Sequence, residues 1–377
     1  MSGNPKRYLN LQKEAIYKKY KEDQGDVFLP SKTGAYRISD EIYNKLFTNM
    51  PDIPEGHLIK GKSTLYDKEG NTVLQWVKTG EDKEQREKVI QAILEGINSK
   101  VEQKKPTPFY PKLGLDSDII NQYTITDYHL GMMAWHEETG DDWDLDIAEE
   151  ILINWFRKAI ELSPNSENCI FAQIGDLTHT DGFEALTPAS KHLLDVDTRF
   201  PKLVRSSIRI LKQIIDMLLD KHKTVYFINA SGNHDPVTSV WIKEVFSFYY
   251  ENEPRIIIDT NPDLYYCHKF GKTLLFYHHG HKRNISNIET VFVSKFKEHF
   301  SDSKNVYGHL GHLHHAKVNE TNLMTLEQHR TLAAKDSYAS GGGWMSGRDS
   351  KVITYHKEFG EVARSVINID MIKRLAE

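Results

Sequence analysis

The sequence predicts an α/β protein in which a layered domain with mixed sheets follows a small α+β region. The first observation is a change of pattern: from about residue 120, short apolar strands alternate with amphipathic helices, and beyond 315 β-like segments dominate. The second is length, because 377 residues suit one large domain with a smaller partner. We therefore expect an N-terminal α+β accessory region over 1–102, a linker or strap over 103–118 and the main domain over 119–377.

Five apolar runs of the main domain have the length and composition of buried strands. Amphipathic helices fit between them, with apolar residues at helical spacing such as Ile147, Ile151 and Trp155. After residue 315 the helical pattern stops, and we expect only β segments. The expected strands are 122–127, 168–174, 224–230, 273–279 and 304–308; the helices are 144–162, 201–221, 236–249 and 287–299; the late β segments are 315–319, 324–331, 351–356 and 363–369.

The first 102 residues mix helical and β patterns, and the stretch after them is extended. Three prolines and a glycine between 103 and 116 predict a linker. Six basic residues against Glu14 alone mark a stretch near the start that could contact nucleic acid or a partner protein. The expected elements are a helix within 6–21, a helix over 39–47 capped by Ser39, a hairpin with strands 63–66 and 72–77, and a helix over 82–100.

The composition is typical of a globular protein, with 39% hydrophobic and 27% charged residues. No apolar stretch approaches the ~18 residues that span a bilayer, and the start lacks the apolar core of a signal peptide. Cys169 and Cys267 lie in apolar runs, which excludes a disulfide scaffold and favours a reducing cytoplasm. The net charge is −5, so no overall basic field indicates nucleic acid.

Metal-ligand residue types follow each predicted strand at its C-terminal end. Seven of the 18 histidines fall within 278–281 and 309–315. Open α/β sheets build their sites at the carboxyl ends of strands. Residues two apart in a strand point to the same side, so Asp127 and His129 can reach one ion. The candidates are Asp127, His129, Asp176, Asn233, His234, Asp235, His279, His281, His312 and His314.

Mixed carboxylate and imidazole ligands suit borderline divalent metals. Mn²⁺ is the first choice, Fe²⁺, Zn²⁺ and Mg²⁺ stay open, and Ca²⁺ is disfavoured. The set is large enough for two ions, which at ~3.5–4 Å apart hold the attacking and leaving oxygens of a phosphoryl displacement. The sequence therefore predicts a site for two divalent metal ions and phosphoryl-transfer chemistry.

The order of these motifs resembles the calcineurin-like metallophosphoesterase superfamily. Its series D-x-H, G-D-x-x-[DH], G-N-H-[DE], H and G-H-x-H occurs here in order between Asp127 and His314. The resemblance covers 120–320 and implies that 119–377 is a metallophosphoesterase catalytic domain, a four-layer metallophosphoesterase-type β-sandwich flanked by helices. Asp127-Tyr-His129-Leu-Gly and Gly-Asp176-Leu-Thr-His179 look most like the SbcD-type DNA repair exonucleases, and the extra N-terminal region is similar to phage-encoded members.

The resemblance also implies roles for single residues. Asp127, His129 and His314 would hold the first metal, and Asp176 would bridge both. The second metal would be held by Asn233, His279 and His312. His234 would assist the leaving oxygen, and His179 would orient His234 by a hydrogen bond. Protein phosphatases and class III cyclic-nucleotide phosphodiesterases carry Asp where His179 stands, which counts against both classes.

Several neighbouring residues have a simpler structural interpretation. We expect His278, His281, His309 and His315 to be structural, although His281 could contact a substrate phosphate. Asp141, Asp142, Asp144 and Asp181 fit solvated loop charges or helix N-caps. Lys282 and Arg283 could bind a non-scissile phosphate. In the glycine-rich loop 341–348, Trp344 could stack on a base and Arg348 could grip a phosphate, although a plain turn fits equally well.

These observations predict a dinuclear-metal phosphoesterase that hydrolyses phosphodiester bonds by attack of a metal-bridging hydroxide. Nucleic acid is the leading substrate, by analogy with the exonuclease motifs. A small-molecule or cyclic-nucleotide phosphodiesterase is the alternative, because 111–377 carries a net charge of −8 and a long polyanion needs a cationic track. A non-catalytic scaffold of the same fold is disfavoured because no ligand position is lost.

Overall fold

The computed structural model describes residues 6–8, 11–24, 37–39, 42, 46, 57–66, 72–81, 88, 91, 103–109 and 114–373. Contacts divide the chain into two compact units, 1–87 and 88–377. The predicted boundaries at 102 and 118 stay predictions. In the described part of the chain, no helix is both long enough and apolar enough to cross a membrane.

Among its described residues, the first unit contains a helix over Leu11–Asp23, two antiparallel strand pairs and single helical residues at 42 and 46. The predicted hairpin is present with longer strands, β3 (His57–Tyr66) and β4 (Thr72–Glu81). Helix α1 spans Leu11–Asp23, so the basic stretch is helical only after the short strand β1 (Lys6–Tyr8). Ser39 is the last residue of strand β2 (Arg37–Ser39), which pairs with β1, and its predicted capping role stays a prediction. The predicted helices over 39–47 and 82–100 lie almost entirely outside the described residues.

The larger sheet of the second unit has six strands in the order β15-β14-β5-β6-β7-β8. Strands β5, β6, β7 and β8 are parallel to one another, whereas β14 runs antiparallel to β5 and to β15. The carboxyl ends of β5, β6 and β7 therefore meet at one edge. The strands are β5 (Asp116–Ile125), β6 (Ser166–Ile174), β7 (Thr224–Ala230), β8 (Ile256–Ile258), β14 (Asp349–His356) and β15 (Gly360–Asn368).

The second sheet has five strands in the order β12-β13-β11-β10-β9. Strand β11 is parallel to both β10 and β13, and the outer strands are antiparallel to their neighbours. The strands are β9 (Tyr266–Phe270), β10 (Thr273–Tyr277), β11 (Asn305–Leu310), β12 (Lys317–Glu320) and β13 (Thr325–Gln328). Strands β8 and β9 were not predicted.

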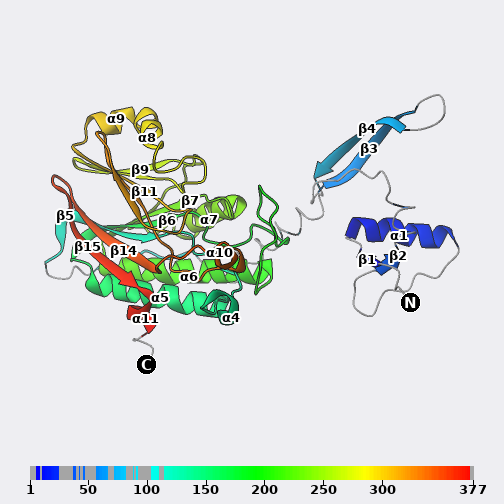
Figure 1. The fold of residues 1–377 in the computed structure, drawn as a ribbon. Helices are drawn as coiled ribbons and strands as arrows, with labels where there is room; N and C mark the ends of the chain where they lie inside the picture. The colour runs from blue at the N-terminus through cyan, green and yellow to red at the C-terminus, as the bar shows by residue number, and fades with distance from the viewer. Residues whose placement is uncertain are drawn as a thin grey trace. The chain divides into compact units, whose positions relative to one another are not determined.

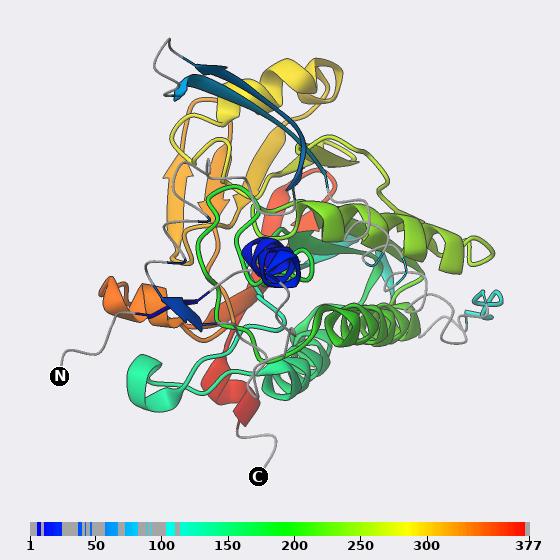
Figure 2. The same cartoon turned by 90° about the vertical axis from the view of Figure 1, so that its right-hand side faces the viewer.

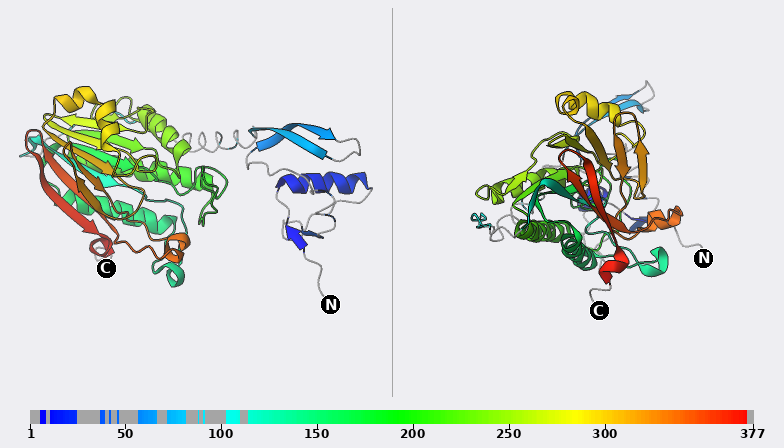
Figure 3. Two further views of the ribbon diagram at one scale, coloured as in Figure 1. Left: turned by 45° about the horizontal axis from the view of Figure 1, so that its top comes forward. Right: turned by 90° about the vertical axis from the view of Figure 1, so that its left-hand side faces the viewer.

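Helices cover the outer face of each sheet. The larger sheet packs on α5 (Leu145–Leu162), α6 (Phe200–Lys221) and α7 (Pro236–Tyr249), and the smaller one on α8 (Glu289–Lys295) and α9 (Lys297–Ser301). Figures 1 and 3 show α5 and α6 on one side of the two sheets and α8 and α9 on the other. Figure 2 shows α5 and α6 side by side, seen nearly end-on. The predicted four-layer sandwich flanked by helices is thus confirmed.

Alternation along the strands builds the core between these layers. In β6, Cys169 and Phe171 face the α5–α6 layer, whereas Ile170, Ala172 and Ile174 face the second sheet. All five side chains are buried, as expected for a parallel strand covered on both faces. This double burial explains why the run 169–174 is apolar except for the buried Gln173 and has no solvent-exposed face.

Three predicted elements differ from the structure. The strand expected over 122–127 ends at Ile125, so Asp127 lies in the following loop. The helix expected over 287–299 is two short helices, because helix α8 ends at Lys295 and Phe296 leaves helical geometry. Helices also occur beyond 315, against expectation. They are α10 (Ser337–Gly341) and α11 (Ile369–Lys373); α4 (His136–Thr139), earlier in the chain, was also not predicted.

Candidate metal centre

The seven predicted metal ligands come together at the carboxyl ends of five strands. Asp127 and His129 follow β5, Asp176 follows β6, and Asn233 follows β7. From the second sheet, His279 follows β10, and His312 and His314 follow β11. Strands of both sheets thus deliver ligands to one place.

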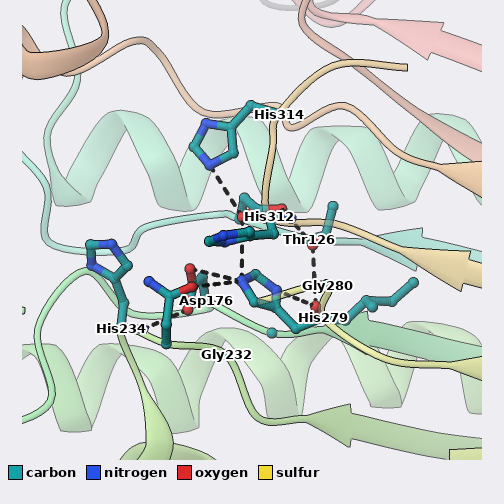
Figure 4. A network of polar contacts seen from close by, with 12 residues as sticks. Thr126, Asp176, Gly232, His234, His279, Gly280, His312 and His314 are labelled. Atoms are coloured by element: carbon teal, nitrogen blue, oxygen red, sulfur yellow. Dashed lines mark hydrogen bonds and ion pairs between the residues drawn. The ribbon is translucent and has the colours of Figure 1, made fainter. Parts of the chain in front are cut away.

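Two groups of donor atoms are formed, and within each group all donors lie within 4.8 Å of one another. Asp127, His129 and His314 make the first group; Asp176, His279 and His312 make the second. Asn233 joins the second group, because its Oδ1 lies 3.2 Å from His279 Nε2. Figure 4 shows Asp176, His279 and His312 facing one another. The grouping agrees with the predicted division of ligands, while their roles stay predictions.

Backbone geometry at the ligands is unlike that of a strand. Asp127, His129, Asp176, His312 and His314 all have positive φ, between 50° and 75°. The expectation that Asp127 and His129 share one side of a strand was therefore wrong: both reach the first ligand group from left-handed backbone conformations. Such conformations cost about 1–3 kcal/mol each and persist where surrounding contacts impose them.

His279 is held in the tautomer that a metal ligand needs. Its Nδ1 donates to the Ile174 carbonyl oxygen at 2.8 Å, so Nε2 carries the free lone pair in the neutral ring. That Nε2 lies 3.0 Å from Asp176 Oδ2. Burial lowers the pKa of His279, but the carboxylates of Asp176 and Asp127 outweigh burial and raise it to about 10. Without a metal ion, a proton on this ring neutralises part of the negative charge.

The Asp127 carboxylate has one oxygen that is bonded and one that is free. Its Oδ2 accepts hydrogen bonds from Thr126 Oγ1 at 2.7 Å and from the His312 backbone N–H at 2.8 Å. Its Oδ1 is buried and makes no hydrogen bond, although His314 Nε2 lies 3.1 Å away. Burial opposes ionisation, yet His314 and His279 hold the pKa of Asp127 well below its usual range. A buried, ionised oxygen without a hydrogen-bond donor fits a cation ligand, so the residues fit the predicted metal ions.

His234 adjoins the first ligand group, and its orientation is fixed in an unexpected way. Its Nδ1 donates to the backbone carbonyl oxygen of His179 at 3.0 Å. The His179 side chain does not make this bond; its Nδ1 lies 3.3 Å from His129 Nδ1, and burial lowers its pKa to about 3. The prediction that His179 orients His234 thus holds for its main chain only. His234 Nε2 remains free to face a substrate.

Asp235, a candidate in the sequence to which the resemblance assigned no separate role, is a structural residue of the centre. Its side chain is buried and accepts the backbone N–H groups of Gly232 at 2.9 Å and of Leu177 at 2.7 Å. It thereby ties the loop after β7 to the loop after β6. Burial, helped by Asp176, raises the pKa of Asp235 to about 7.

The four histidines expected to be structural divide between core and rim. His278 is buried and stacks on Tyr265, with ring centroids 4.6 Å apart. His309 is buried beside His329 and hydrogen-bonds to Tyr355 at 3.0 Å. His315 is exposed. The ring of His281 lies 5.4 Å from that of His279, and its Nδ1 is buried without a hydrogen bond.

A further group of possible donors, His309, Glu327 and His329, lies away from the centre within 4.8 Å of one another. Glu327 already pairs with Lys351 and with Arg364, whose Nη1 lies 2.7 Å from Glu327 Oε1. A divalent ion there would sit beside two fixed positive charges, so this group is an ion-pair network and not a metal site.

The loop charges are more structural than predicted. Asp144 caps α5 by accepting the Ile147 N–H, as expected. Asp181 is not a solvated charge: it accepts the N–H groups of Val237 and Thr238 at the start of α7, and burial raises its pKa to about 6. Asp142 accepts from the His136 N–H at 2.8 Å.

The Arg348 guanidinium is engaged within the protein, and its phosphate contact stays a prediction. Its guanidinium pairs with Asp141 at 2.9 Å, packs over Trp143 and donates to the Leu332 carbonyl oxygen, and its side chain is only 11% exposed. Trp344 in the same loop is 57% exposed and lies against Tyr338. Lys282 and Arg283 are exposed, so their phosphate contact stays a prediction.

Comparisons with known proteins leave the family open. No family profile and no curated protein matches the sequence. Solved structures that resemble the fold include a predicted phosphoesterase of Streptococcus pneumoniae (11% identity, TM-score 0.31, 67% of this chain and 91% of that one) and a dimetal phosphatase of Danio rerio (8%, 0.36, 67% and 100%). A zinc complex of Vps29 from Entamoeba histolytica is a third (9%, 0.29, 67% and 99%). Likeness at this level carries no argument about function, which rests on the residues themselves.

Proposed function

We propose that this chain is a metal-dependent phosphoesterase of the calcineurin-like type, using two divalent ions to hydrolyse phosphodiester bonds, with nucleic acid as the leading substrate. The observation that carries the proposal is the pair of adjacent donor groups with His234 beside them. Two ions held there would supply a nucleophile from water near neutral pH and neutralise charge on the phosphoryl oxygens.

The residues of the chain divide the remaining work. Asp127, His129 and His314 would hold one ion and Asn233, His279 and His312 the other, with Asp176 shared. His234 uses Nδ1–H to hold the His179 carbonyl, so in the doubly protonated ring Nε2–H would deliver a proton to the leaving oxygen, and the ring would regain a proton from the attacking water. Asp235 keeps the two loops in register so that His234 and Asp176 stay aligned. No covalent intermediate with the protein is needed.

The test is a substrate panel on metal-stripped protein, with Mn²⁺, Fe²⁺, Zn²⁺ and Mg²⁺ added back singly. Hydrolysis of bis(4-nitrophenyl) phosphate in preference to 4-nitrophenyl phosphate is expected, with Mn²⁺ the best activator. Linear DNA, RNA and cyclic nucleotides then follow, and linear nucleic acid should be cleaved in preference to cyclic nucleotides. Absence of hydrolysis with every ion would contradict the phosphoesterase proposal, and preference for the monoester would contradict its diester form.

A small-molecule phosphodiesterase is the second candidate, favoured by one observation. The cavity beside His234 is lined by the carboxylates of Asp195 and Asp336. A polynucleotide continuing through this cavity would bring its phosphates against those two negative charges.

A further inference from the structure

A cavity of about 280 Å³ opens directly beside His234, and none of the roles predicted for the site residues involves it. His179, Asn233 and His234 form its inner end. One wall is the loop 187–195, and the other is the start of α10 at 336–338. The two walls are joined, because Ser337 Oγ donates to Asp195 Oδ2 at 2.8 Å. Its volume is close to the lower end of small-molecule sites, about 300–1,000 Å³.

The loop that forms the first wall is ordered by its own hydrogen bonds. The backbone of Thr187 donates to the His192 carbonyl oxygen at 2.9 Å, and Thr187 Oγ1 accepts the His192 N–H at 2.9 Å. Leu194 N–H donates to the Ala185 carbonyl oxygen, also at 2.9 Å. The wall is thus a closed loop in which His192 and Leu193 lie beside Thr187 and Leu186 at its base.

The lining has the chemistry of a site for a neutral, planar, hydroxyl-bearing group. Tyr338 is 69% and Leu193 81% exposed, and the His192 ring lies 6.3 Å from the Tyr338 ring, inclined by 34°. An exposed aromatic ring of this kind stacks on a nucleobase. Asp195 and Asp336 are acceptors for hydroxyl and amino donors, and both repel phosphate. Among the residues that line the cavity, all of them described, none is Lys or Arg.

We infer that this cavity is the leaving-group subsite and that it takes one nucleoside carrying no further phosphate. The inference rests on the proposed function. Hydrolysis breaks the bond between phosphorus and the leaving oxygen, forms a bond between phosphorus and a water oxygen, and delivers a proton to the leaving oxygen. His234 Nε2 makes that delivery at the inner end of the cavity, so the released alcohol occupies the cavity itself.

Thymidylyl-thymidine and its two forms with a phosphate at one end test the inference, with product analysis showing which nucleoside leaves. The form whose leaving nucleoside bears the phosphate should have kcat/KM at least about tenfold below that of thymidylyl-thymidine. The variant Asp195→Asn should reduce the ratio of kcat/KM for thymidylyl-thymidine to kcat/KM for the form with a phosphate on the leaving nucleoside. The reason is that the substitution removes one negative charge and keeps an acceptor for Ser337. Asp220→Asn, at the far end of α6, is the matched control and should keep the ratio. Equal turnover of all three substrates would overturn the inference.

A binding measurement separates this inference from the phosphoesterase proposal. Thymidine should broaden or shift NMR signals of the metal-free protein, and Tyr338→Ala should weaken that binding several-fold. Phe359→Ala, an equally exposed aromatic on the β14–β15 turn, should not. If thymidine does not bind while bis(4-nitrophenyl) phosphate is still hydrolysed, the subsite inference is wrong and the phosphoesterase proposal stands. If thymidine binds but the protein is inactive with every ion, the nucleoside-binding cavity stands and the phosphoesterase proposal is wrong.

A leaving nucleoside without a further phosphate can be the terminal residue of a nucleic-acid strand or part of a small nucleotide ester. An oligothymidylate with hydroxyl groups at both ends distinguishes the two sources. Loss of one terminal nucleoside per chain indicates a chain end, and turnover of the dinucleotide alone indicates a small ester. Cleavage of the oligonucleotide at internal positions would overturn the inference, because an internal leaving group always continues into a phosphate.

Discussion

A buried ion cluster joins the two sheets and offers a test of the fold that is independent of any metal. Glu327, on β13 of the smaller sheet, is 4% exposed. Its Oε1 pairs with Lys351 on β14 and with Arg364 Nη1 on β15, at 2.7 Å for the latter, and both partners belong to the larger sheet. One carboxylate therefore pairs with two cations across the sandwich, and Glu361 is the second partner of Arg364.

Glu327→Gln should destabilise the protein strongly. It leaves the buried Lys351 ammonium with a neutral partner, whereas Arg364 keeps its pairing with Glu361, and loss of one member of a buried ion pair costs about 3–5 kcal/mol. At about 2 °C per kcal/mol for a domain of this size, Tm should fall by roughly 5–10 °C. The measurement is thermal unfolding followed by circular dichroism in chelator, with the exposed Glu358→Gln as control. A fall no larger than that of the control would refute the reasoning.

The same cluster fixes the sign of a pH dependence. Burial raises the pKa of Glu327, but its charged partners, with His329 first, outweigh burial and hold the pKa well below 4.5. A carboxyl group with a depressed folded-state pKa contributes stability that is fully present above the unfolded value and is lost as the pH falls toward the folded value. The difference in Tm between the parent protein and Glu327→Gln should therefore be constant from pH 7 to about 5 and shrink below pH 4.5.

Three further predictions concern the site and its surroundings. Asp176→Asn should lower hydrolysis of bis(4-nitrophenyl) phosphate by more than about 10²-fold with the circular dichroism spectrum unchanged; unchanged activity would place the chemistry elsewhere. His234→Asn should lower kcat by about 10²–10⁴-fold for an alkyl leaving group and by much less for 4-nitrophenolate, which needs no proton; an equal loss for both would exclude proton donation. Arg348→Ala should lower Tm by several degrees without changing KM for bis(4-nitrophenyl) phosphate, because its guanidinium binds Asp141 and Trp143. A raised KM would indicate that Arg348 contacts the substrate phosphate.

Periodicity predicted the layers of the second unit because burial imposes it. From Cys169 to Ile174, strand β6 is apolar except for Gln173 because it is covered on both faces, and α6 has a regular apolar stripe because only one face packs on the sheet. The site followed from the same pattern, since parallel strands carry their carboxyl ends to a common edge. Knowing the strands was therefore enough to expect that Asp127, Asp176 and Asn233 would converge.

Loop geometry could not be predicted in the same way, because a loop has no period. The sequence treated Asp127 and His129 as strand neighbours, whereas the backbone turns left-handed at both. It assigned the orientation of His234 to the His179 ring, whereas the His179 main chain makes the bond. Main-chain hydrogen bonds of this kind leave no residue-type signal. The cavity beside His234 escaped notice for a related reason, since its two walls are separated by about 140 residues and are joined only in space.

The strained backbone at the predicted metal ligands depends on the close packing of the loops around them. Five non-glycine residues with positive φ would together cost several kcal/mol, so the surrounding contacts must enforce them. Two glycines make those contacts possible: a Cβ at Gly232 would collide with the Asp176 carboxylate, and one at Gly311 with Thr126 and Asp127. The His312 N–H reaches Asp127 Oδ2, and the His234 N–H reaches Asp176 Oδ1, because both glycines let the loops approach. The two carboxylates are thus positioned by the protein before any ion arrives, with Asp127 Oδ1 left free to receive one.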